Sequence, residues 1–585
     1  MLKKWFISNK AADFQHITEK FKVSEIIARV MVNRGVKEDN DIEEYLNGTI
    51  NDMHDPLLMK DMDKARDIII EKANEKKRIR IVGDYDVDGI VSTFVLYDAL
   101  KNIGACVDYC VPDRIKDGYG INKDIIKRAY DDGIDTILTC DNGIAALEQA
   151  EYAWELGMTM VITDHHDVPF EENDGVKRQI LPKAKAVVNP HRDDCAYPYK
   201  NLCGASVSYK LVEAIYKKLG FKKEDVTKYI EYIAIATVCD VMELKKENRI
   251  IVKHGLYALI NTSNKGLRAL YVVNNLTSLN VFHLGFVIGP CLNATGRLSS
   301  ATRAIELLSC DDEKKAISIA TELKELNDSR KDMTKENFEK ALQMIEESDM
   351  IYDKIIVVYL KDCHESLAGI IAGRIREKYY KPAIVLTEGE GIVKGSCRSI
   401  EQYNIFEELT RCKDLLTKFG GHPMAAGLSL PMENVELLRR RLNDNTTLTE
   451  EDLIPKVSID IALPFGYVNE DVINELEKLE PCGKDNEKPI FAERNVTVSK
   501  AKVFGKNRNV LKCSLTNEYG RTMEGIYFGD IEEFETYITD KFGSEELNKL
   551  YNGFNNVIKL SIIYYPVINE FNGRRTVQIQ IKEYR

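Results

Sequence analysis

In the stretch IRIVGDYDVDGIVS, residues Ile79–Ser92, a mostly apolar run is followed by three aspartates, Asp84, Asp86 and Asp88, within one turn. The apolar run has the character of a buried β-strand, and the residues after Gly89 return to an apolar pattern. Carboxylates crowded onto one turn repel one another, and each raises the pKa of its neighbours. Such a turn therefore needs either full exposure to water or a compensating positive charge.

The alternation of strand and helix continues beyond this turn. Short β-rich runs occur at residues 79–83, 106–111, 136–140, 159–163 and 185–189, and helical segments separate them. Strands that alternate with helices indicate an α/β fold with a parallel, doubly wound sheet. Ligands of such sheets bind at the carboxyl ends of the strands.

Acids or histidines follow three of the predicted strands. The first strand leads into Asp84–Asp88, the third into Asp141, and the fourth into Asp164-His165-His166. Parallel strands end at one edge of a sheet, so we expect these side chains to meet there. Downstream, the apolar run IEYIAIATVCD indicates a buried helix that ends in Asp240. The convergence predicts a cation site.

Oxygen ligands suit Mg²⁺ or Mn²⁺, and imidazole ligands shift the preference towards Mn²⁺. Two metals about 3.5–4 Å apart need a bridging carboxylate and several terminal ligands, and such pairs serve phosphoryl-group hydrolysis. The sequence offers enough ligands for two metals: Asp84, Asp86, Asp88, Asp141, His165 and Asp240. This predicts phosphoester hydrolysis without specifying a substrate.

These residues have other possible interpretations. An EF-hand calcium loop requires Glu at its twelfth position, where this chain has Val95, and no phosphate-binding glycine motif follows the first strand. A solvated acidic turn remains an alternative for Asp84–Asp88 taken alone. For the His165–His166 pair, the alternative is that both are surface or capping histidines. For Asp240, the alternative is that it simply ends a helix.

The whole chain has 585 residues, too many for one hydrophobic core, with 44% hydrophobic and 30% charged residues. Thirteen cysteines without a CxxC pair, no signal-peptide pattern and no long apolar run predict a cytoplasmic protein without a membrane span. The net charge of -12 argues mildly against a nucleic-acid partner.

The pattern along the chain predicts five parts. These are an N-terminal helical segment (1–60), an α/β domain (61–311), a connecting helix (312–349), a smaller α/β domain (350–450) and a β-rich domain (455–585). Residues 312–348 carry no Gly or Pro, and a mobile linker is the alternative there. The last part suggests a small barrel or sandwich, of the kind that binds oligonucleotides.

A series of longer motifs carries a family resemblance. GDYDVDGIVST, DNG at 141–143, TDHHDVP, VNPHRDD, IATVCDVMEL, GPCLNATGRL, CHESLAGIIAGRI and FGGHPMAAGL occur in this order. In order and spacing they resemble the bacterial RecJ exonucleases of the DHH phosphoesterase superfamily, over most of the chain up to residues 479–491. The resemblance implies a DHH domain (61–311), a DHH-associated domain (350–450) and an oligonucleotide-binding β-barrel.

The resemblance also implies a function. The family degrades single-stranded DNA from the 5′ end in DNA repair and recombination, with two divalent cations, Mn²⁺ preferred and Mg²⁺ as the alternative. By family analogy, the expected partners beyond single-stranded DNA are a helicase and a single-strand-binding protein, and the expected state is a monomer.

Residue roles are carried over by position. Asp84, Asp86, Asp88, Asp141, His165 and Asp240 would bind the metals, with Asp141 as the bridge. His166 would contact the scissile phosphate or shape the nucleophile, and Asp164 would orient a histidine. The DNA backbone and its 5′ end would be held by Arg297, Arg374, Ser396, Arg398, Gly421 and His422. The alternatives are surface salt bridges for the arginines and a buried structural role for His422.

The chain departs from the family pattern at three places. Cys291 stands where many relatives have Arg, and Cys397 stands where Gly is common. The segment LEPCGKDNEKPIF differs from the family's usual motif, PFGxGNP. These departures concern contacts to the substrate and not the metal site. Two rival functions are a DHH phosphoesterase acting on oligoribonucleotides or cyclic dinucleotides, and a non-catalytic replication factor. The β-rich C-terminal region argues against the first, and the intact acid set argues against the second.

Overall fold

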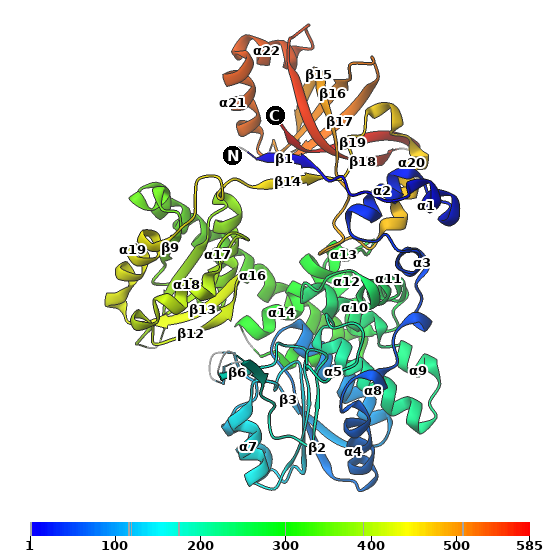
Figure 1. The fold of residues 1–585 in the computed structure, drawn as a ribbon, viewed down its shortest axis with the longest axis vertical. Coiled ribbons are helices and arrows are strands. Elements are labelled where there is room, and N and C mark those ends of the chain that lie inside the picture. The colour runs from blue at the N-terminus through cyan, green and yellow to red at the C-terminus, as the bar shows by residue number, and fades with distance from the viewer. Residues whose placement is uncertain are drawn as a thin grey trace. The chain divides into compact units, whose positions relative to one another are not determined.

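The computed structural model describes residues 3–114, 117–118, 120–173, 176–298, 300–389, 391–505, 508–571 and 573–585 (Figure 1). The chain forms two compact units. The first unit consists of Met1–Lys4, Asp55–Asp240 and Tyr257–Pro455, and the second of Trp5–His54, Val241–Leu256 and Lys456–Arg585.

The first unit is built around a five-stranded parallel sheet, which confirms the predicted α/β fold. Its strands are ordered β3-β2-β4-β5-β8. They are β2 (Arg78–Val82), β3 (Cys106–Cys110), β4 (Thr136–Cys140), β5 (Thr159–Thr163) and β8 (Ala186–Val188). All five were predicted from the sequence. Outside this sheet, β6 (Phe170–Asn173) and β7 (Val176–Gln179) form a separate antiparallel pair.

Helices precede, separate and follow these strands along the chain. The helices around this sheet are α4 (Met62–Asn74), α5 (Val87–Asn102), α6 (Lys123–Asp131), α7 (Leu147–Glu155), α8 (Gly204–Leu219), α9 (Lys223–Thr227) and α10 (Ile230–Cys239). Side chains of α6 and α7, such as Ile125 and Ala150, share an apolar cluster with Ile137 and Ile162 of the sheet. Helix α10 is buried along its length and ends at Asp240, as the sequence predicted.

A helical layer connects this sheet to a second one in the same unit. It contains α12 (Lys265–Val273), α13 (Val281–His283), a π-helix (Leu284–Ile288), α14 (Gly289–Leu298), α15 (Thr302–Leu308) and α16 (Glu313–Glu346). The side chain of Asp312 caps α16 by accepting a hydrogen bond from the Lys315 amide at 2.7 Å. With 34 residues, α16 is about 50 Å long. The predicted helix over 312–348 is confirmed, and the linker alternative is wrong.

The second sheet of this unit has the strand order β12-β13-β11-β10-β9. Its strands are β9 (Ile356–Tyr359), β10 (Ala383–Glu388), β11 (Val393–Arg398), β12 (Lys418–His422) and β13 (Ala425–Leu430), accompanied by α17 (Glu365–Tyr379), α18 (Ile405–Arg411) and α19 (Val435–Asn445). Strands β9 and β10 are parallel, and the other neighbours are antiparallel. Strand β12 is an edge strand that ends in Gly420-Gly421-His422.

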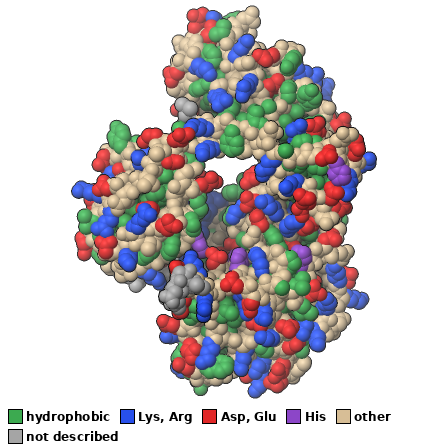
Figure 2. All heavy atoms as spheres, in the orientation of Figure 1, with side chains coloured by type: hydrophobic (Ala, Val, Ile, Leu, Met, Phe, Trp, Pro, Cys, Tyr) green, Lys and Arg blue, Asp and Glu red, His purple; other side chains and the backbone are tan. Residues whose placement is uncertain are grey.

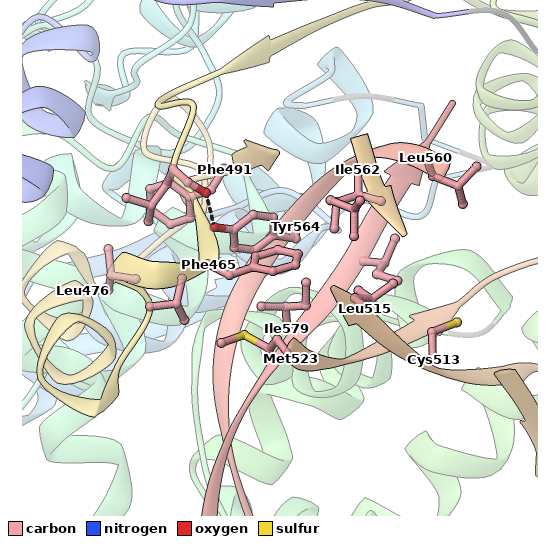
Figure 3. Packing of buried hydrophobic residues seen from close by; sticks show 14 of the residues in the cluster. Phe465, Leu476, Phe491, Cys513, Leu515, Met523, Leu560, Ile562, Tyr564 and Ile579 are labelled. Carbon is pink, nitrogen blue, oxygen red and sulfur yellow. Dashed lines mark hydrogen bonds between the residues drawn. The ribbon is translucent and has the colours of Figure 1, made fainter. Parts of the chain in front are cut away.

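The second unit contains the expected small barrel, closed in the order β15-β16-β17-β19-β18. Its strands are β15 (Phe491–Phe504), β16 (Val510–Thr516), β17 (Thr522–Phe528), β18 (Lys559–Phe571) and β19 (Arg574–Tyr584). In its core, the hydroxyl of Tyr564 donates a hydrogen bond to the Leu463 carbonyl at 2.5 Å, beside Phe465 and Phe491 (Figure 3). Helices α20 (Glu470–Leu476), α21 (Ile531–Phe542) and α22 (Ser544–Asn552) lie within this region, which the sequence indicated only as β-rich.

The N-terminal helices belong to the second unit. They are α1 (Phe14–Phe21), α2 (Glu25–Asn33) and α3 (Asp39–Asn47). Ile27 and Met31 of α2 share one apolar cluster with Leu476 and Leu479 and with the barrel core. The helical prediction for residues 1–60 missed β1 (Lys4–Ile7), which pairs with β14 (Lys456–Ile459). A strand this short is set by its partner rather than by local propensity.

A buried arginine organises the loop before the barrel. Arg249, on α11 (Lys246–Ile260), donates to five backbone carbonyls of the second unit. One carbonyl belongs to Tyr45, and the other four are those of residues 478–481. The guanidinium also lies 3.8 Å from the centre of the Tyr45 ring. The departing motif LEPCGKDN is therefore held by a side chain far from it in sequence.

Two expectations about the whole chain can be compared with the structure. Each of the thirteen cysteines is a free thiol, in line with the predicted lack of a disulfide framework. Among the described residues, no helix has both the length and the apolar character that crossing a membrane requires.

Candidate active site

The turn after β2 places two of the predicted acids. Asp86 caps α5, since its Oδ1 accepts a hydrogen bond from the Gly89 amide at 3.0 Å. A Cβ atom on Gly89 would lie 2.5 Å from backbone atoms of Asp84, so the first turn of the helix can close over Asp84 only with glycine there. Glycine permits this close approach because it has no side chain.

Asp88 is held by the start of another helix. Its carboxylate accepts hydrogen bonds from the amides of Gly204 at 2.6 Å and Ala205 at 2.8 Å, at the N-terminus of α8. Helix N-termini carry partial positive charge and favour anions. A Cβ atom on Gly204 would lie 2.6 Å from the Cβ of Asp141, so glycine at this position lets α8 approach both acids.

Asp141 follows β4 in a left-handed backbone conformation, with φ of 59°. This region is sparsely populated except by Gly, Asn and Asp. The next residue, Asn142, donates from its amide group to the carbonyls of Val82 at 3.0 Å and Cys140 at 2.9 Å. These bonds join the ends of β2 and β4, and they bring Asp141 beside the turn after β2.

Asp164 anchors the histidine pair after β5. Its Oδ1 accepts from the amides of His165 at 2.7 Å and His166 at 3.2 Å, and from Nδ1 of His166 at 2.7 Å. Its Oδ2 accepts from the Ile144 amide at 2.8 Å. Both oxygens of Asp164 are thus occupied within the protein, and the ring of His166 is fixed through its Nδ1.

His165 lies at the centre of the acids. Its Nε2 is 3.1 Å from Asp141 Oδ1, 3.6 Å from Asp88 Oδ2 and 3.8 Å from Asp240 Oδ2. Asp240 reaches the cluster from the C-terminal end of α10.

Three overlapping groups have ligand atoms within 4.8 Å of one another and could hold a metal ion. They are Asp84, Asp86 and Asp141; Asp88, His165 and Asp240; and Asp141, His165 and His166. The structure therefore brings together all six side chains that were predicted as ligands. Asp141 belongs to two of the groups, a position that suits a bridge.

The electrostatics of the acids favour a bound cation. Burial, followed by the charge of Asp86, raises the pKa of Asp84 to about 8. Burial and the charge of Asp88 raise the pKa of Asp86 and, much further, that of Asp141. Asp84 Oδ1 is buried and has no hydrogen-bond partner among the residues that the structure describes. A divalent cation would satisfy this oxygen and offset the repulsion, so the donor set fits Mg²⁺ or Mn²⁺.

The two histidines differ in charge. Burial lowers the pKa of His165, which keeps its imidazole neutral and able to act as a ligand. Burial would also lower the pKa of His166, but the hydrogen bond and charge of Asp164 outweigh it and raise that pKa to about 9. In the metal-free protein, Asp164 therefore favours the protonated form of His166 beside the acids.

A pocket of about 380 Å³ lies in the first unit between the turn after β2 and the second sheet. Its lining includes Ser396, which the sequence predicted, and Gly420 of the Gly-Gly-His motif. The other predicted nucleic-acid residues do not line this pocket: Arg297, Arg374, Arg398, Gly421 and His422.

Several of these residues nevertheless have definite surroundings. Arg297 donates to the Ser366 carbonyl at 2.6 Å, and burial together with Arg114 and Arg330 lowers the pKa of Arg297 to about 10. Burial also lowers the pKa of Arg398. Arg374 packs its guanidinium 5.8 Å from the centre of the Phe338 ring.

The Gly-Gly-His motif has strict backbone requirements. Gly421 has φ of 149°, and a Cβ there would lie 2.4 Å from the Ala425 carbonyl, so the β12–β13 hairpin needs glycine at this position. His422 is exposed, with its Nδ1 3.8 Å from Asp167 Oδ2. The alternative of a buried structural histidine is therefore wrong.

Sequence reasoning missed part of the pocket lining. Tyr85, Arg114, Lys394 and Lys418 line the pocket and were not singled out. Tyr85 stands inside the acidic turn and Lys418 begins the strand that carries Gly420, so both had a signal in the sequence. Arg114 had none, because only the fold brings it to Tyr85, where its guanidinium lies 5.0 Å from the ring centre.

The two cysteine departures are buried. Cys291 lies 3.6 Å from the side-chain nitrogen of Asn327 and 3.8 Å from that of Asn274. Cys397 is part of the apolar core of the second sheet. Neither side chain lines the pocket.

Comparisons with known proteins agree with this architecture. Three family models match: the DHH family N-terminal domain over residues 78–237, the DHHA1 domain over 353–447 and the RecJ OB domain over 459–583. The chain is 34% identical to the single-stranded-DNA-specific exonuclease RecJ of Bacillus subtilis, across 99% of this chain and 70% of that protein. It is 30% identical to the protein of that name from Escherichia coli, across 95% of each.

A solved structure shows the same fold. The crystal structure of RecJ from Thermus thermophilus in complex with Mn²⁺ matches with a TM-score of 0.80 at 24% identity, covering 100% of this chain and 79% of that one. The three family models and the two relatives agree with this assignment. The chain belongs to the RecJ family of single-stranded-DNA-specific exonucleases.

Proposed function

We propose that this protein is a divalent-metal-dependent exonuclease that hydrolyses the phosphodiester bonds of single-stranded DNA in the 5′-to-3′ direction. The observation that carries the proposal is the convergence of five acids and a histidine on one buried cluster, in a chain whose relatives bear the exonuclease name. In the cell, the enzyme acts in DNA repair and recombination. The direction of digestion rests on family resemblance.

The proposed metal ligands are Asp84, Asp86, Asp88, Asp141, His165 and Asp240. Solved RecJ structures from Thermus thermophilus contain Mn²⁺ or Mg²⁺, and here the imidazole of His165 favours Mn²⁺. When bound, two such cations supply the positive charge that draws in a phosphodiester and eases the ionisation of water. Asp141 is the proposed bridge because it lies between the acidic turn and His165.

The remaining groups at the cluster have distinct proposed roles. The hydrogen bond and charge of Asp164 favour the protonated form of His166, and a positive charge there would attract an oxygen of the scissile phosphate. Asp164 holds that ring in place through Nδ1 and keeps it protonated. The amides of Gly204 and Ala205 hold the Asp88 carboxylate in a fixed orientation.

The second sheet and its neighbours would hold the strand. Basic residues that repel one another attract an anion, and the pKa of Arg297 is lowered by burial and by two other arginines. Arg297, Arg374, Ser396, Arg398, Gly421 and His422 are the proposed contacts to the DNA backbone and its 5′ end. The net charge of -12 does not forbid this, because Figure 2 shows acidic and basic side chains interspersed over the face it presents.

Domain division and partners complete the proposal. We keep the five parts 1–60, 61–311, 312–349, 350–450 and 455–585. The family matches lie inside the second, fourth and fifth of them. The protein would act as a cytoplasmic monomer, together with a helicase and a single-strand-binding protein by family analogy.

The proposal is tested with end-labelled single-stranded DNA, duplex DNA and dinucleotides, each with Mn²⁺ or with EDTA. We expect only the single strand to be degraded, and only with Mn²⁺. A 5′-labelled strand should release labelled mononucleotide at once, whereas a 3′-labelled strand should shorten progressively. Preferred cleavage of dinucleotides would favour the rival phosphoesterase, and no cleavage at all would favour a binding protein.

A site variant separates the ligand assignment from the function. Asp141→Ala should abolish degradation and weaken Mn²⁺ binding in a calorimetric titration. If this variant degraded DNA at the wild-type rate, the proposed metal site would be wrong even though the exonuclease activity stood.

A further inference from the structure

Helix α14 presents one narrow face with an unusual composition. In an α-helix each residue turns by about 100°, so positions 289, 293 and 296 fall within a sector of about 60°. These positions carry Gly289, Asn293 and Gly296. The opposite side of the helix carries Cys291, which contacts Asn274 and Asn327. Asn293 is therefore the polar residue of a face otherwise made of glycine.

The two glycines show what this face touches. A Cβ on Gly289 would lie 2.2 Å from the sulfur of Cys239, the residue before Asp240. A Cβ on Gly296 would lie 2.2 Å from the carbonyl oxygen of Tyr85, which stands between Asp84 and Asp86. Both approaches are possible only without a side chain. The face thus runs from the Asp240 side of the metal cluster to its Asp84–Asp86 side, and Asn293 lies between these two contacts.

The amide oxygen of Asn293 needs a hydrogen-bond donor. Oδ1 is buried, and within the described part of the chain it has no partner. Leaving such an acceptor unsatisfied costs about 1–3 kcal/mol, so native proteins seldom do so. A DNA backbone offers no hydroxyl donor, since the 2′-OH belongs to RNA, and the neighbouring carboxylates are acceptors when ionised. A water molecule is small enough to reach this oxygen, and buried waters commonly satisfy such groups.

We propose that Asn293 accepts a hydrogen bond from a water molecule at the metal cluster and positions it for attack on the phosphodiester. The inference rests on the proposed function and deepens it. Asn293 is a positioning residue: it neither takes nor gives a proton, and it is not a metal ligand. Its amide oxygen restricts the orientation of the water, which favours the reactive geometry.

The test compares Asn293→Ala with Asn293→Asp, which keeps an acceptor oxygen at the same place. At saturating Mn²⁺, Asn293→Ala should lower kcat on single-stranded DNA about 10–100-fold, the usual cost of losing an outer partner of a metal site. Its KM for DNA and its Mn²⁺ affinity, measured by calorimetry without DNA, should stay unchanged. Asn293→Asp should recover part of kcat.

Asn327→Ala is the matched control. Asn327 is a buried asparagine on α16 that contacts the opposite side of α14 through Cys291. This control should lower the melting temperature and leave kcat unchanged. If both alanine variants lowered kcat alike, packing of α14 would explain the loss and the inference would fall.

Three further outcomes would overturn the inference while leaving the proposed function intact. One is a wild-type kcat in Asn293→Ala. Another is a parallel loss of Mn²⁺ affinity, which would make Asn293 a ligand. The third is an Asn293→Asp variant as impaired as Asn293→Ala. A wild-type protein that degrades no single-stranded DNA would instead overturn the proposed function, and the inference with it.

Discussion

At the scale of single residues, the acid cluster destabilises the metal-free protein. The pKa of Asp84 is raised from 3.8 to about 8, chiefly by burial. Between these values the folded chain keeps a proton that the unfolded chain releases. The contribution of Asp84 to stability is therefore fully present below pH ~4 and is lost as the pH rises towards ~8.

The direction of this effect gives a prediction about how stability depends on pH. In EDTA, the free energy of unfolding from urea titrations should fall between pH 5 and 8 more steeply for the wild type than for Asp84→Asn. The difference cannot exceed about 1.4 kcal/mol per pH unit for one group. Saturating Mn²⁺ should remove it, because a cation holds the carboxylate ionised at every pH in this range. Equal slopes for the two proteins in EDTA would contradict the assignment.

Gly204 gives a second prediction at this scale. Alanine at this position would place its Cβ 2.6 Å from Asp141 and displace the amides that hold Asp88. Gly204→Ala should therefore lower stability by about 1–3 kcal/mol, as overpacking usually does, and should abolish Mn²⁺ binding. Calorimetry and thermal unfolding measure both effects.

The matched control is Gly373→Ala on α17, where a Cβ meets no atom within 4 Å. It should leave Mn²⁺ binding unchanged and stabilise the protein by about 0.5–1 kcal/mol, because alanine is a better helix residue than glycine. A Gly204→Ala protein that bound Mn²⁺ like the wild type would show that the close approach is not required.

Residues directly after strands were predictable, and residues brought in by helix packing were not. Asp84, Asp141 and His165 follow apolar runs whose ends must meet at one sheet edge. Asn293 and Arg114 reach the site only through the packing of α14 and the position of a loop. No local pattern encodes either contact, and the same holds for the amides of Gly204 and Ala205 that bind Asp88.

At the scale of elements, β4 and β5 of the first sheet were readable because their side chains are almost all buried and form largely apolar runs. Helices α21 and α22 were missed because they interrupt a β-rich region, and α21 itself carries aromatic and β-branched residues. Strand β1 was missed for a different reason: its partner β14 lies more than 400 residues away.

The loop held by Arg249 gives the prediction for this scale. Lysine has three donors where the guanidinium has five, so Arg249→Lys would remove at least two of the five hydrogen bonds. Each hydrogen bond lost costs about 0.5–1.5 kcal/mol. Hydrogen exchange should show faster opening of residues 478–486 and of α3.

Lys253→Arg is the control, one turn further on α11, where a single bond joins Nζ to the Leu46 carbonyl at 3.0 Å. It should leave the exchange of both segments unchanged. Unaltered protection in Arg249→Lys would mean that the loop is held by Asn486, which donates to the carbonyls of Leu479 and Pro481.

At the scale of the whole molecule, every proposed metal ligand belongs to the first unit. Binding that is specific to the folded state stabilises by about 2.7 kcal/mol at a ligand concentration one hundred times Kd. Mn²⁺ should therefore slow hydrogen exchange in β4, β5 and the first turn of α5, and leave the barrel strands β15–β19 unchanged. Equal protection of the barrel would place a metal site in the second unit.

The second unit combines segments from both ends of the chain, and this affects how it can fold during synthesis. Residues 5–54 leave the ribosome about 400 residues before the barrel segment 456–585, a delay of about 20–80 s at the usual rates of translation. Throughout that time, side chains such as Ile27 and Met31 lack the barrel residues that bury them. A nascent chain that stalls before residue 456 presents an uncovered apolar surface to chaperones and proteases, although its metal-binding residues have all been made.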